Sequence, residues 1–391
     1  MTTTADRPAP ALAAARPPRF GLLADLDRPA RAFAHITPNW YAAVMGTGIV
    51  AVAAASLPEQ FPGLRAAATV VWALAAGLLV AVTAATAAHW RRHPQAARAH
   101  ARDPVMVMFY GAPPMALLTV GAGLLLLGRQ VVGLRLAVDA DWALWLAGTT
   151  LGLVTATAVP CLMFTRHRVQ PGPAFGGWLM PVVPPLVSAS TGALLLPHLA
   201  DAQARLALLL ACYAMFGLSV LASLIVITLI WGRLASHGVG PARLVPTLWL
   251  ILGPLGQSVT AANLLGLVAR DALPAPYAKA LRMLGVLYGV PVWGFAVLWT
   301  AIAAAITLRT ARRHLPFSLT WWSFTFPVGT CVTATTTLAA PTGSVALRVA
   351  AAVWYAGLVL AWLTVALRTA HGTARGRLLL PPPGQPAHTS R

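Results

Sequence analysis

The chain has 391 residues, of which 58% are apolar and only 9% are charged. Soluble domains carry charge on roughly a quarter of their residues, so this composition excludes an ordinary water-soluble protein. The formal net charge of +19 does not indicate a nucleic-acid partner, because the basic residues are spread along the chain and no recognition motif organises them.

Apolar segments of the length that crosses a bilayer, roughly 20 residues, recur between short clusters of charge. In chain order they cover residues 38–57, 66–89, 104–128, 142–165, 175–197, 206–231, 244–268, 283–308, 317–340 and 345–367. They predict an all-α integral membrane protein with ten transmembrane helices in one transport domain, residues 31–370. Residues 1–30 and 371–391 are expected to be disordered cytoplasmic tails, and the first lacks the apolar core of a signal peptide.

The basic residues predict the orientation of these helices, because Lys and Arg in short loops are retained on the cytoplasmic side of a membrane. With both termini inside, 20 of the 28 Lys and Arg residues fall in cytoplasmic segments. We therefore expect a multi-pass protein of the inner (cytoplasmic) membrane with both termini in the cytoplasm. Tryptophans near the ends of the apolar segments, such as Trp145 and Trp322, are expected in the aromatic belts at the lipid surfaces.

Prolines recur inside alternate apolar segments. Pro114, Pro184, Pro254 and Pro327 follow one another at intervals of about 70 residues, and the stretch Met45–Gly48 precedes the first of them by a similar interval. This period is that of a two-helix unit, so the sequence predicts five helical hairpins. In each hairpin the first helix is rich in Pro, Gly, Ser and Thr, and the second is mostly Ala, Leu and Val.

Backbone groups freed at Pro and Gly are tolerated at membrane depth only where protein or a water-filled cavity faces them. This favours a quasi-fivefold array in which the five odd-numbered helices line a central pore and the even-numbered helices wrap them. The alternative is that the small residues only let helices pack closely. The candidate pore-lining residues are Gly46, Thr47, Gly48, Pro113, Pro114, Pro184, Pro185, Ser188, Pro254, Gln257, Ser258, Thr325, Pro327 and Thr330.

The charges and polar groups favour an anion in such a pore. All nine acidic residues are expected in tails and loops, whereas a permeant cation or a proton-coupled pump would use a carboxylate at membrane depth. Neutral groups such as Ser190, Thr191 and Asn263 can bind a partly dehydrated anion weakly, although Ser and Thr also bond back to their own helix. No motif predicts a metal site, a cofactor or catalysis, and a membrane sensor or enzyme is the alternative from another class.

Five motifs carry a resemblance to a known family. They are ITPNWYAAVMGTGIV at residues 36–50, HP at 93–94 followed by FYGAPPM at 109–115, MPVVPPLVSASTGA at 180–193, LGPLGQS at 252–258 and WWSFTFPVGT at 321–330. With them the chain resembles the tellurite-resistance/dicarboxylate transporter family, which includes slow anion channels, malate permeases and sulfite efflux pumps. The resemblance implies five hairpins with the odd-numbered helices inside, a homotrimer surrounded by membrane lipid with one pore per subunit, and a small anion as the substrate.

The resemblance also singles out a candidate gate. In the family's anion channels a phenylalanine on the ninth helix plugs the pore, and the matching motif offers Phe326, directly before Pro327, with Phe324 as the neighbouring candidate. A bulky apolar ring can close a pore by steric block and dewetting. We therefore expect an anion channel or facilitative transporter for C4-dicarboxylates such as malate or for chloride or nitrate, with a sulfite efflux pump of the same family as the alternative.

Overall fold

The computed structural model describes residues 33–166 and 174–380, and every regular element in these two ranges is a helix. This confirms the all-α prediction. Eight helices, or runs of consecutive helices, in the described ranges are long and apolar enough to cross a membrane. The two principal helices that fall short of this length are α7 (Pro184–Leu195) and α11 (Phe326–Thr342), which have 12 and 17 residues.

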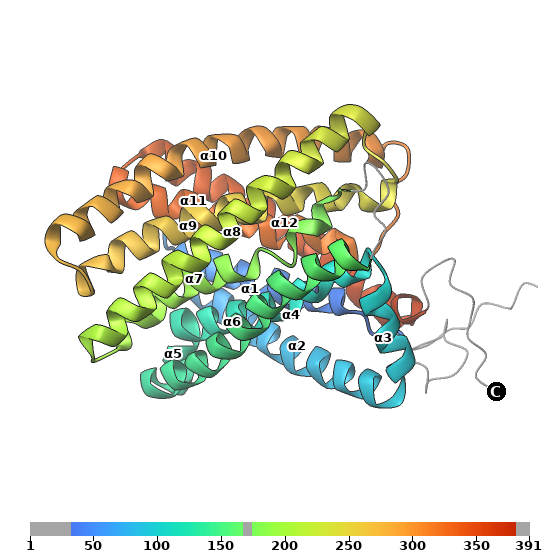
Figure 1. The fold of residues 1–391 in the computed structure, drawn as a ribbon, viewed down its shortest axis with the longest axis horizontal. Coiled ribbons are helices and arrows are strands. Elements are labelled where there is room, and N and C mark those ends of the chain that lie inside the picture. The colour runs from blue at the N-terminus through green and yellow to red at the C-terminus, as the bar shows by residue number, and fades with distance from the viewer. Residues whose placement is uncertain (1–32, 167–173, 381–391) are drawn as a thin grey trace, which may run out of the picture.

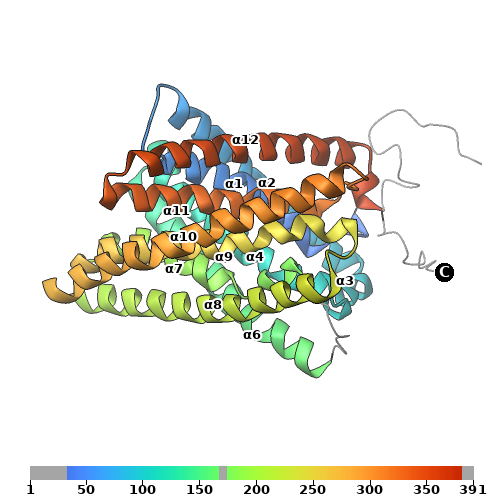
Figure 2. The ribbon, with the colours of Figure 1, turned by 90° about the horizontal axis from the view of Figure 1, so that it is seen from above.

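The principal helices follow one another as packed pairs. The pairs are α1 (Tyr41–Ser56) with α2 (Leu64–Arg92), α4 (Ala112–Gly123) with α6 (Leu134–Thr165), α7 with α8 (Ala202–His237), α9 (Leu252–Val268) with α10 (Ala275–Ala311), and α11 with α12 (Val345–Ala374). Two short helices, α3 (Pro94–Arg102) and α5 (Arg129–Val132), lie between these elements. Figures 1 and 2 show the pairs side by side in one elongated bundle.

The first helix of each pair lies inside the bundle. α1 contacts α4, α4 contacts α7, α7 contacts α9, α9 contacts α11, and α11 contacts α1, so these five inner helices form a closed ring. Nearly all their residues are buried, whereas α2, α6, α8, α10 and α12 expose one apolar face. Figure 2 shows α12 and α8 on opposite sides of the bundle, with α11 and α9 between them.

The recurring prolines mark changes of helix type. Each of α4, α9 and α11 is preceded by a 3₁₀ segment, namely Met106–Gly111, Ala242–Ile251 and Leu319–Phe324, and α7 follows the 3₁₀ turn Gly176–Leu179 and a short turn. Pro113 and Pro114, Pro184 and Pro185, Pro254, and Pro327 all lie in the first turn of an α-helix. Proline is tolerated there because the N–H groups of a first turn have no partner within the helix. The predicted helix breaks therefore exist as 3₁₀-to-α junctions at one level of the bundle.

Tryptophan hydrogen bonds join the inner and outer helices. The indole N–H of Trp145 on α6 donates to the Ser188 carbonyl oxygen on α7 at 2.9 Å, and Trp72 on α2 donates to a backbone carbonyl of α4 at 3.0 Å. Trp322, before α11, donates to Thr369 of α12 at 3.1 Å. Trp145 and Trp322 are buried, so the expectation that they lie in the aromatic belts is wrong. Their N–H groups hold neighbouring helices together instead.

Two acidic residues lie inside a candidate span, where the sequence analysis expected none. α6 begins at Leu134, so Asp139 and Asp141 fall in its first turns. Asp141 is buried, its Oδ1 lies against Gly121 of α4, and its Oδ2 has no hydrogen-bond partner among the described residues. The expectation failed because these carboxyls lower the local hydropathy, so the apolar segment was begun at residue 142, after both of them.

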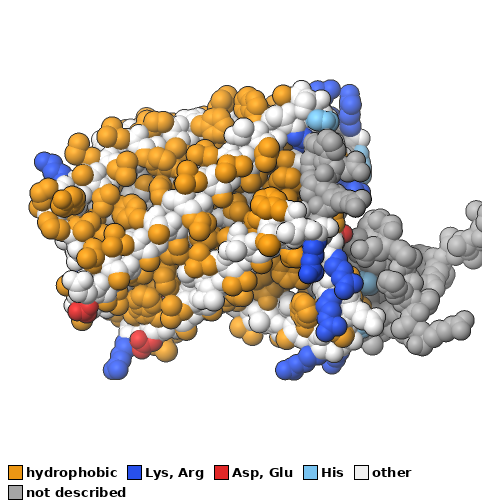
Figure 3. Space-filling view, viewed as in Figure 1, with side chains coloured by type: hydrophobic (Ala, Val, Ile, Leu, Met, Phe, Trp, Pro, Cys, Tyr) orange, Lys and Arg blue, Asp and Glu red, His pale blue; other side chains and the backbone are white. Residues whose placement is uncertain are grey.

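Charge divides the two ends of the bundle. Figure 3 shows apolar side chains covering the flank, with most of the visible Lys and Arg gathered at one end. The C-terminal ends of the inner helices lie at the opposite end, where Arg348 at the start of α12 pairs with Glu59 of the α1–α2 loop at 3.3 Å.

The predicted second tail begins at residue 371, but this residue lies in the last turns of α12, which ends at Ala374. Residues 1–30 lie outside the described ranges.

Imidazoles cluster where α2 ends and α3 begins. The His100 ring of α3 stacks on the buried His89 ring of α2 with centroids 5.3 Å apart, and His93 lies 6.1 Å from His89. Burial lowers the pKa of His100 from its ordinary value of 6.5 to about 4; nearby His89 and His35 lower it further, and Asp103 opposes them. α3 is therefore docked through a neutral His100.

This docking should weaken in acid. Because the pKa of His100 is lower in the folded state than its ordinary value, the contribution of His100 to stability is fully present above pH 6.5 and is lost as the pH falls through about 4. Hydrogen exchange of the α3 amides, corrected for the intrinsic pH dependence, should rise over this window, and His100→Gln should weaken the dependence. Equal protection of α3 at neutral pH and at pH about 4 would contradict this expectation.

Candidate functional site

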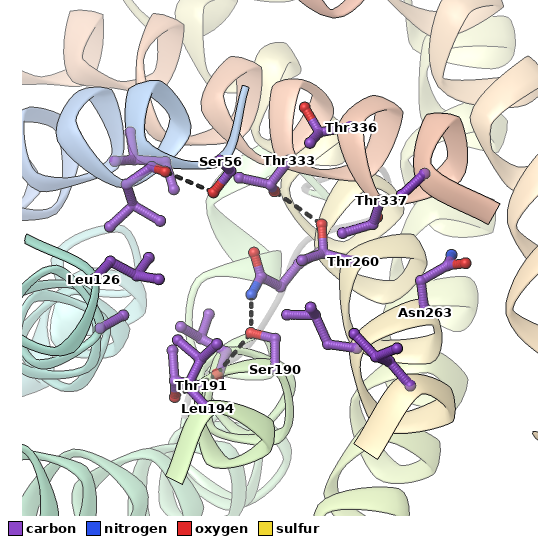
Figure 4. Close-up of a pocket in the computed structure, with 18 of the residues that line it drawn as sticks. Ser56, Leu126, Ser190, Thr191, Leu194, Thr260, Asn263, Thr333, Thr336 and Thr337 are labelled. Atoms are coloured by element: carbon purple, nitrogen blue, oxygen red, sulfur yellow. Dashed lines mark hydrogen bonds between the residues drawn. The ribbon is translucent and has the colours of Figure 1, made fainter. Parts of the chain in front are cut away.

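A cavity of about 340 Å³ opens between the inner helices toward the end of the bundle where their C-termini lie. All five inner helices contribute to its wall, and α10 adds one residue. Figure 4 shows the lining side chains converging from α1, α4, α7, α9 and α11. The residues that line it are Ile49, Val52, Ser56, Thr119, Ala122, Leu126, Val187, Ser190, Thr191, Leu194, Gln257, Thr260, Asn263, Leu264, Leu267, Arg282, Phe326, Thr333, Thr336, Thr337, Ala340 and Pro341.

The polar groups of the wall link helices that are distant in the sequence. The Gln257 amide of α9 donates to the Ser190 hydroxyl of α7. The hydroxyls of Thr260 on α9 and Thr333 on α11 are hydrogen-bonded at 2.8 Å (Figure 4). A mobile anion could exchange places with such neutral hydrogen bonds at modest cost, since each contributes only about 1 kcal/mol net.

Phe326 lies at the inner end of this cavity, where its side chain is 2% exposed. The same residue also borders a second cavity, of about 10 Å³, on the opposite side. That smaller cavity is lined by Met45, Met115, Leu179, Met180, Val183, Leu250, Gly253 and Pro327 together with Phe326. The phenylalanine ring therefore separates a roomy polar cavity from a narrow apolar constriction at the level of the 3₁₀-to-α junctions.

Close helix packing fixes the position of Phe326 at the start of α11. A Cβ at Gly46 of α1 would overlap the Thr325 hydroxyl, and a Cβ at Gly256 of α9 would lie 2.5 Å from the backbone carbonyl carbon of Thr330. The Thr330 hydroxyl also donates to a backbone carbonyl of α9 at 3.1 Å. Two neighbouring inner helices thus hold the first turn of α11, which limits the freedom of the Phe326 side chain.

Three of the predicted site residues border one of the two cavities. They are Gln257, Phe326 and Pro327. Of the neutral groups considered beside them, Ser190, Thr191 and Asn263 also line the large cavity.

The other predicted site residues contact neighbouring helices or their own helix. Thr47 accepts a hydrogen bond from Trp362 of α12 at 3.1 Å, and the Ser188 hydroxyl accepts one from Thr149 of α6 at 2.9 Å. Hydroxyls that bond to carbonyls of their own segment belong to Ser258, Thr325 and Thr330. The residues that border neither cavity are Gly46, Thr47, Gly48, Pro113, Pro114, Pro184, Pro185, Ser188, Pro254, Ser258, Thr325 and Thr330.

Several lining residues were missed by the sequence analysis. Thr333, Thr336 and Thr337 of α11 face the cavity at the three- and four-residue spacing of one helix face, and this spacing is the signal that could have found them. Thr119 and Thr260 also follow the proline of their helix and line the wall. Arg282 belongs to the outer helix α10, and nothing in its local sequence distinguishes it from other loop-proximal arginines.

The wall carries positive but no negative charge. Among the described lining residues, Arg282 alone is charged, and none is acidic. The buried Asp141 does not line the cavity: it packs against Gly121. No group of His, Cys, Asp and Glu side chains in the described ranges has the geometry to hold a metal ion. The Arg282 guanidinium gives the cavity a potential that favours an anion. Lining hydroxyls such as Thr119 and Thr191 donate to carbonyls of their own helices and would have to rotate to bind one.

Comparison with known proteins gives relatives along most of the chain. Residues 35–370 match the model of a family described as voltage-dependent anion channel. A sulfite efflux pump of Arthroderma otae is 30% identical over 311 residues, which cover 78% of this chain and 82% of the relative, and a sulfite efflux pump of Trichophyton rubrum has the same identity and coverage. An uncharacterized transporter of Methanocaldococcus jannaschii is 26% identical over 302 residues, which cover 76% of this chain and 82% of the relative.

The family match includes all five inner helices and ends within α12. It confirms the resemblance that the motifs indicated. The chain therefore belongs to the voltage-dependent anion channel family.

Proposed function

We propose that the protein is an anion channel or facilitative transporter whose path runs between the five inner helices, through the large cavity and past Phe326. In this proposal ten helices cross the bilayer as five hairpins in a quasi-fivefold array. The closed ring of contacts among the inner helices supports this array, as does the packing of each inner helix against an outer one. Although α7 and α11 are short, each follows a 3₁₀ segment, Gly176–Leu179 and Leu319–Phe324 respectively.

The observation that carries the proposal is the chemistry of the cavity wall. Its described polar groups are hydroxyls, two amides and the Arg282 guanidinium, without a carboxylate. A cation would leave its hydration shell without compensation from a negative group, whereas an anion would gain hydrogen bonds and a favourable potential. A transport path for anions therefore fits this wall better than a path for cations.

The proposed orientation places both termini in the cytoplasm of a cell with the protein in its inner membrane. The gathering of Lys and Arg at one end supports it (Figure 3), since basic residues are retained on the cytoplasmic side. With this orientation the large cavity opens to the outside of the membrane, and Phe326 with the methionine-rich constriction closes the path toward the cytoplasm.

We also propose a homotrimer with one path in each subunit, with membrane lipid covering the remaining outer surface. The exposed apolar faces of the outer helices give both lipid and neighbouring subunits a surface to contact. Mass measurement in detergent should give three copies of the 40.9 kDa chain. A monomer that still transports would show that the trimer is not needed.

Sulfite is a second candidate substrate beside C4-dicarboxylates, chloride and nitrate. It is favoured by the sulfite efflux pumps among the relatives, which match over most of their own length. A cavity of about 340 Å³ accommodates a C4-dicarboxylate such as malate as well as the smaller anions. Membership of a channel and transporter family likewise favours transport over the alternative of a membrane sensor or enzyme.

Flux assays in proteoliposomes test this function and choose among the anions. Sulfite, chloride, nitrate and malate are supplied one at a time, and potassium is the cation control. At least one anion should move faster than in protein-free vesicles, and potassium should not. Sulfite flux well above the other three would favour the efflux pump, whereas potassium flux alone would contradict the proposal.

A further inference from the structure

We propose that Arg282 forms an entry subsite for a small oxyanion at the open end of the large cavity. The inference deepens the proposed function and rests on it. Arg282 was not a candidate from the sequence. It supplies a guanidinium, whose forked N–H groups match the oxygens of an oxyanion in pairs.

Arg282 reaches the cavity although it belongs to an outer helix. Two glycines allow α9 and α10 to approach closely there: a Cβ at Gly266 would lie 3.0 Å from the Arg282 Cα, and a Cβ at Gly285 would lie 2.9 Å from the Asn263 Oδ1. The Asn263 amide donates to the Gly285 carbonyl at 3.0 Å, which fixes this register. The guanidinium therefore borders the cavity because of specific backbone contacts.

The charge of Arg282 is available to a ligand. At the same end of the bundle Arg270 pairs with Asp271 at 3.7 Å and Arg348 pairs with Glu59 at 3.3 Å. Arg282 forms no ion pair or hydrogen bond with any residue in the described ranges, and it is exposed to solvent. An arriving anion would thus not have to displace an acidic side chain.

The side-chain amide of Asn263, which also lies near the rim, has no N–H group left to donate to an anion. Both donated hydrogen bonds of Asn263 go to backbone carbonyls, of Val259 and of Gly285. Only its oxygen remains for the cavity, and an oxygen acceptor does not bind an anion. At the rim this leaves the Arg282 guanidinium as a donor that no described residue engages.

The test is sulfite flux against external sulfite concentration in proteoliposomes, with Lys279→Gln as the matched control. Lys279 lies one turn before Arg282 on α10 and carries the same charge, but it does not line the cavity. Arg282→Gln should raise the half-saturating sulfite concentration about tenfold. Charge of a single sign in a cleft raises the local concentration of counter-ions by about this factor. Lys279→Gln should change it less than about twofold, since exposed charge outside the cleft is screened by salt.

Arg282 and Lys279 are both exposed, so neither substitution should change the melting temperature. Equal effects of Arg282→Gln and Lys279→Gln on the half-saturating concentration would overturn the subsite and leave the proposed function intact. Absence of anion flux in the unmodified protein would instead refute the proposed function.

Discussion

Phe326→Ala is expected to raise anion flux about tenfold or more, because the ring is the barrier between the two cavities. Removing it joins the polar cavity of about 340 Å³ to the constriction beyond it and leaves less apolar surface to keep the path dry. The substitution adds no charge, so the preference for anions should persist. Truncating a buried phenylalanine also costs about 3 to 5 kcal/mol of stability, so flux must be compared per folded molecule in proteoliposomes.

Phe324→Ala is the matched control for this gate. Phe324 is only two residues away, but its ring packs edge-on against Trp249 and Trp321, with centroids 5.6 and 5.7 Å away, and it borders neither cavity. Its loss should lower stability without raising flux. If Phe324→Ala opens the path and Phe326→Ala does not, the assignment of the gate is incorrect.

Gly111→Ala is expected to cause a large loss of stability. Gly111 ends the 3₁₀ segment before α4, and a Cβ there would overlap the backbone carbonyl of Met180 and approach the nitrogen of Pro181. A backbone neighbour cannot move aside as a flexible side chain can, so we expect at least about 3 kcal/mol of destabilisation, the upper end for overpacked sites. A thermal unfolding curve in detergent measures it.

Gly77→Ala provides the comparison for this methyl group. Gly77 lies on the exposed face of α2, and a Cβ there meets no atom within 4 Å. Alanine has a higher helix propensity than glycine by about 1 kcal/mol, so this variant should be as stable as the unmodified protein or more stable. A Gly111→Ala protein that unfolds at the same temperature as Gly77→Ala would show that the segments before α4 and α7 are not in such close contact.

The proline pattern predicted much of the helix arrangement, because it depends on backbone chemistry that sequence shows directly. Pro113 and Pro327 each had to lie where a missing N–H does no harm, and the structure places both in the first turn of an α-helix. The helical hairpins and the inner position of α1 and α7 followed from the same period and from the small residues near it. Phe326 was predicted from its place in the motif WWSFTFPVGT, which resembles the family, and not from any periodicity of the sequence.

The direction of individual side chains was much harder to predict. Inner helices are apolar on every side because protein surrounds them, so the helical period does not show which face meets the cavity. Thr47 and Ser188 sit among polar, small residues like those of the wall, yet both bond to outer helices. The packing role of Gly46 and Gly256 likewise depends on contacts between helices far apart in the sequence.

Charged residues were misplaced for a related reason. The placement of Asp141 outside the spans relied on hydropathy, which two carboxyls close together lower whether or not they are buried. Arg282 was treated as one of several arginines at the outer loops, because only the approach of α10 to α9 at Gly266 brings it to the cavity. Such positions depend on packing between helices, which a single sequence does not reveal.

The central claim is that the path through the five inner helices selects anions. The most direct test is the reversal potential of the opened variant Phe326→Ala in planar bilayers under a potassium chloride gradient. We expect a reversal potential close to the chloride equilibrium potential, because the described wall offers hydroxyls and Arg282 but no carboxylate. A reversal potential close to the potassium equilibrium potential would contradict it.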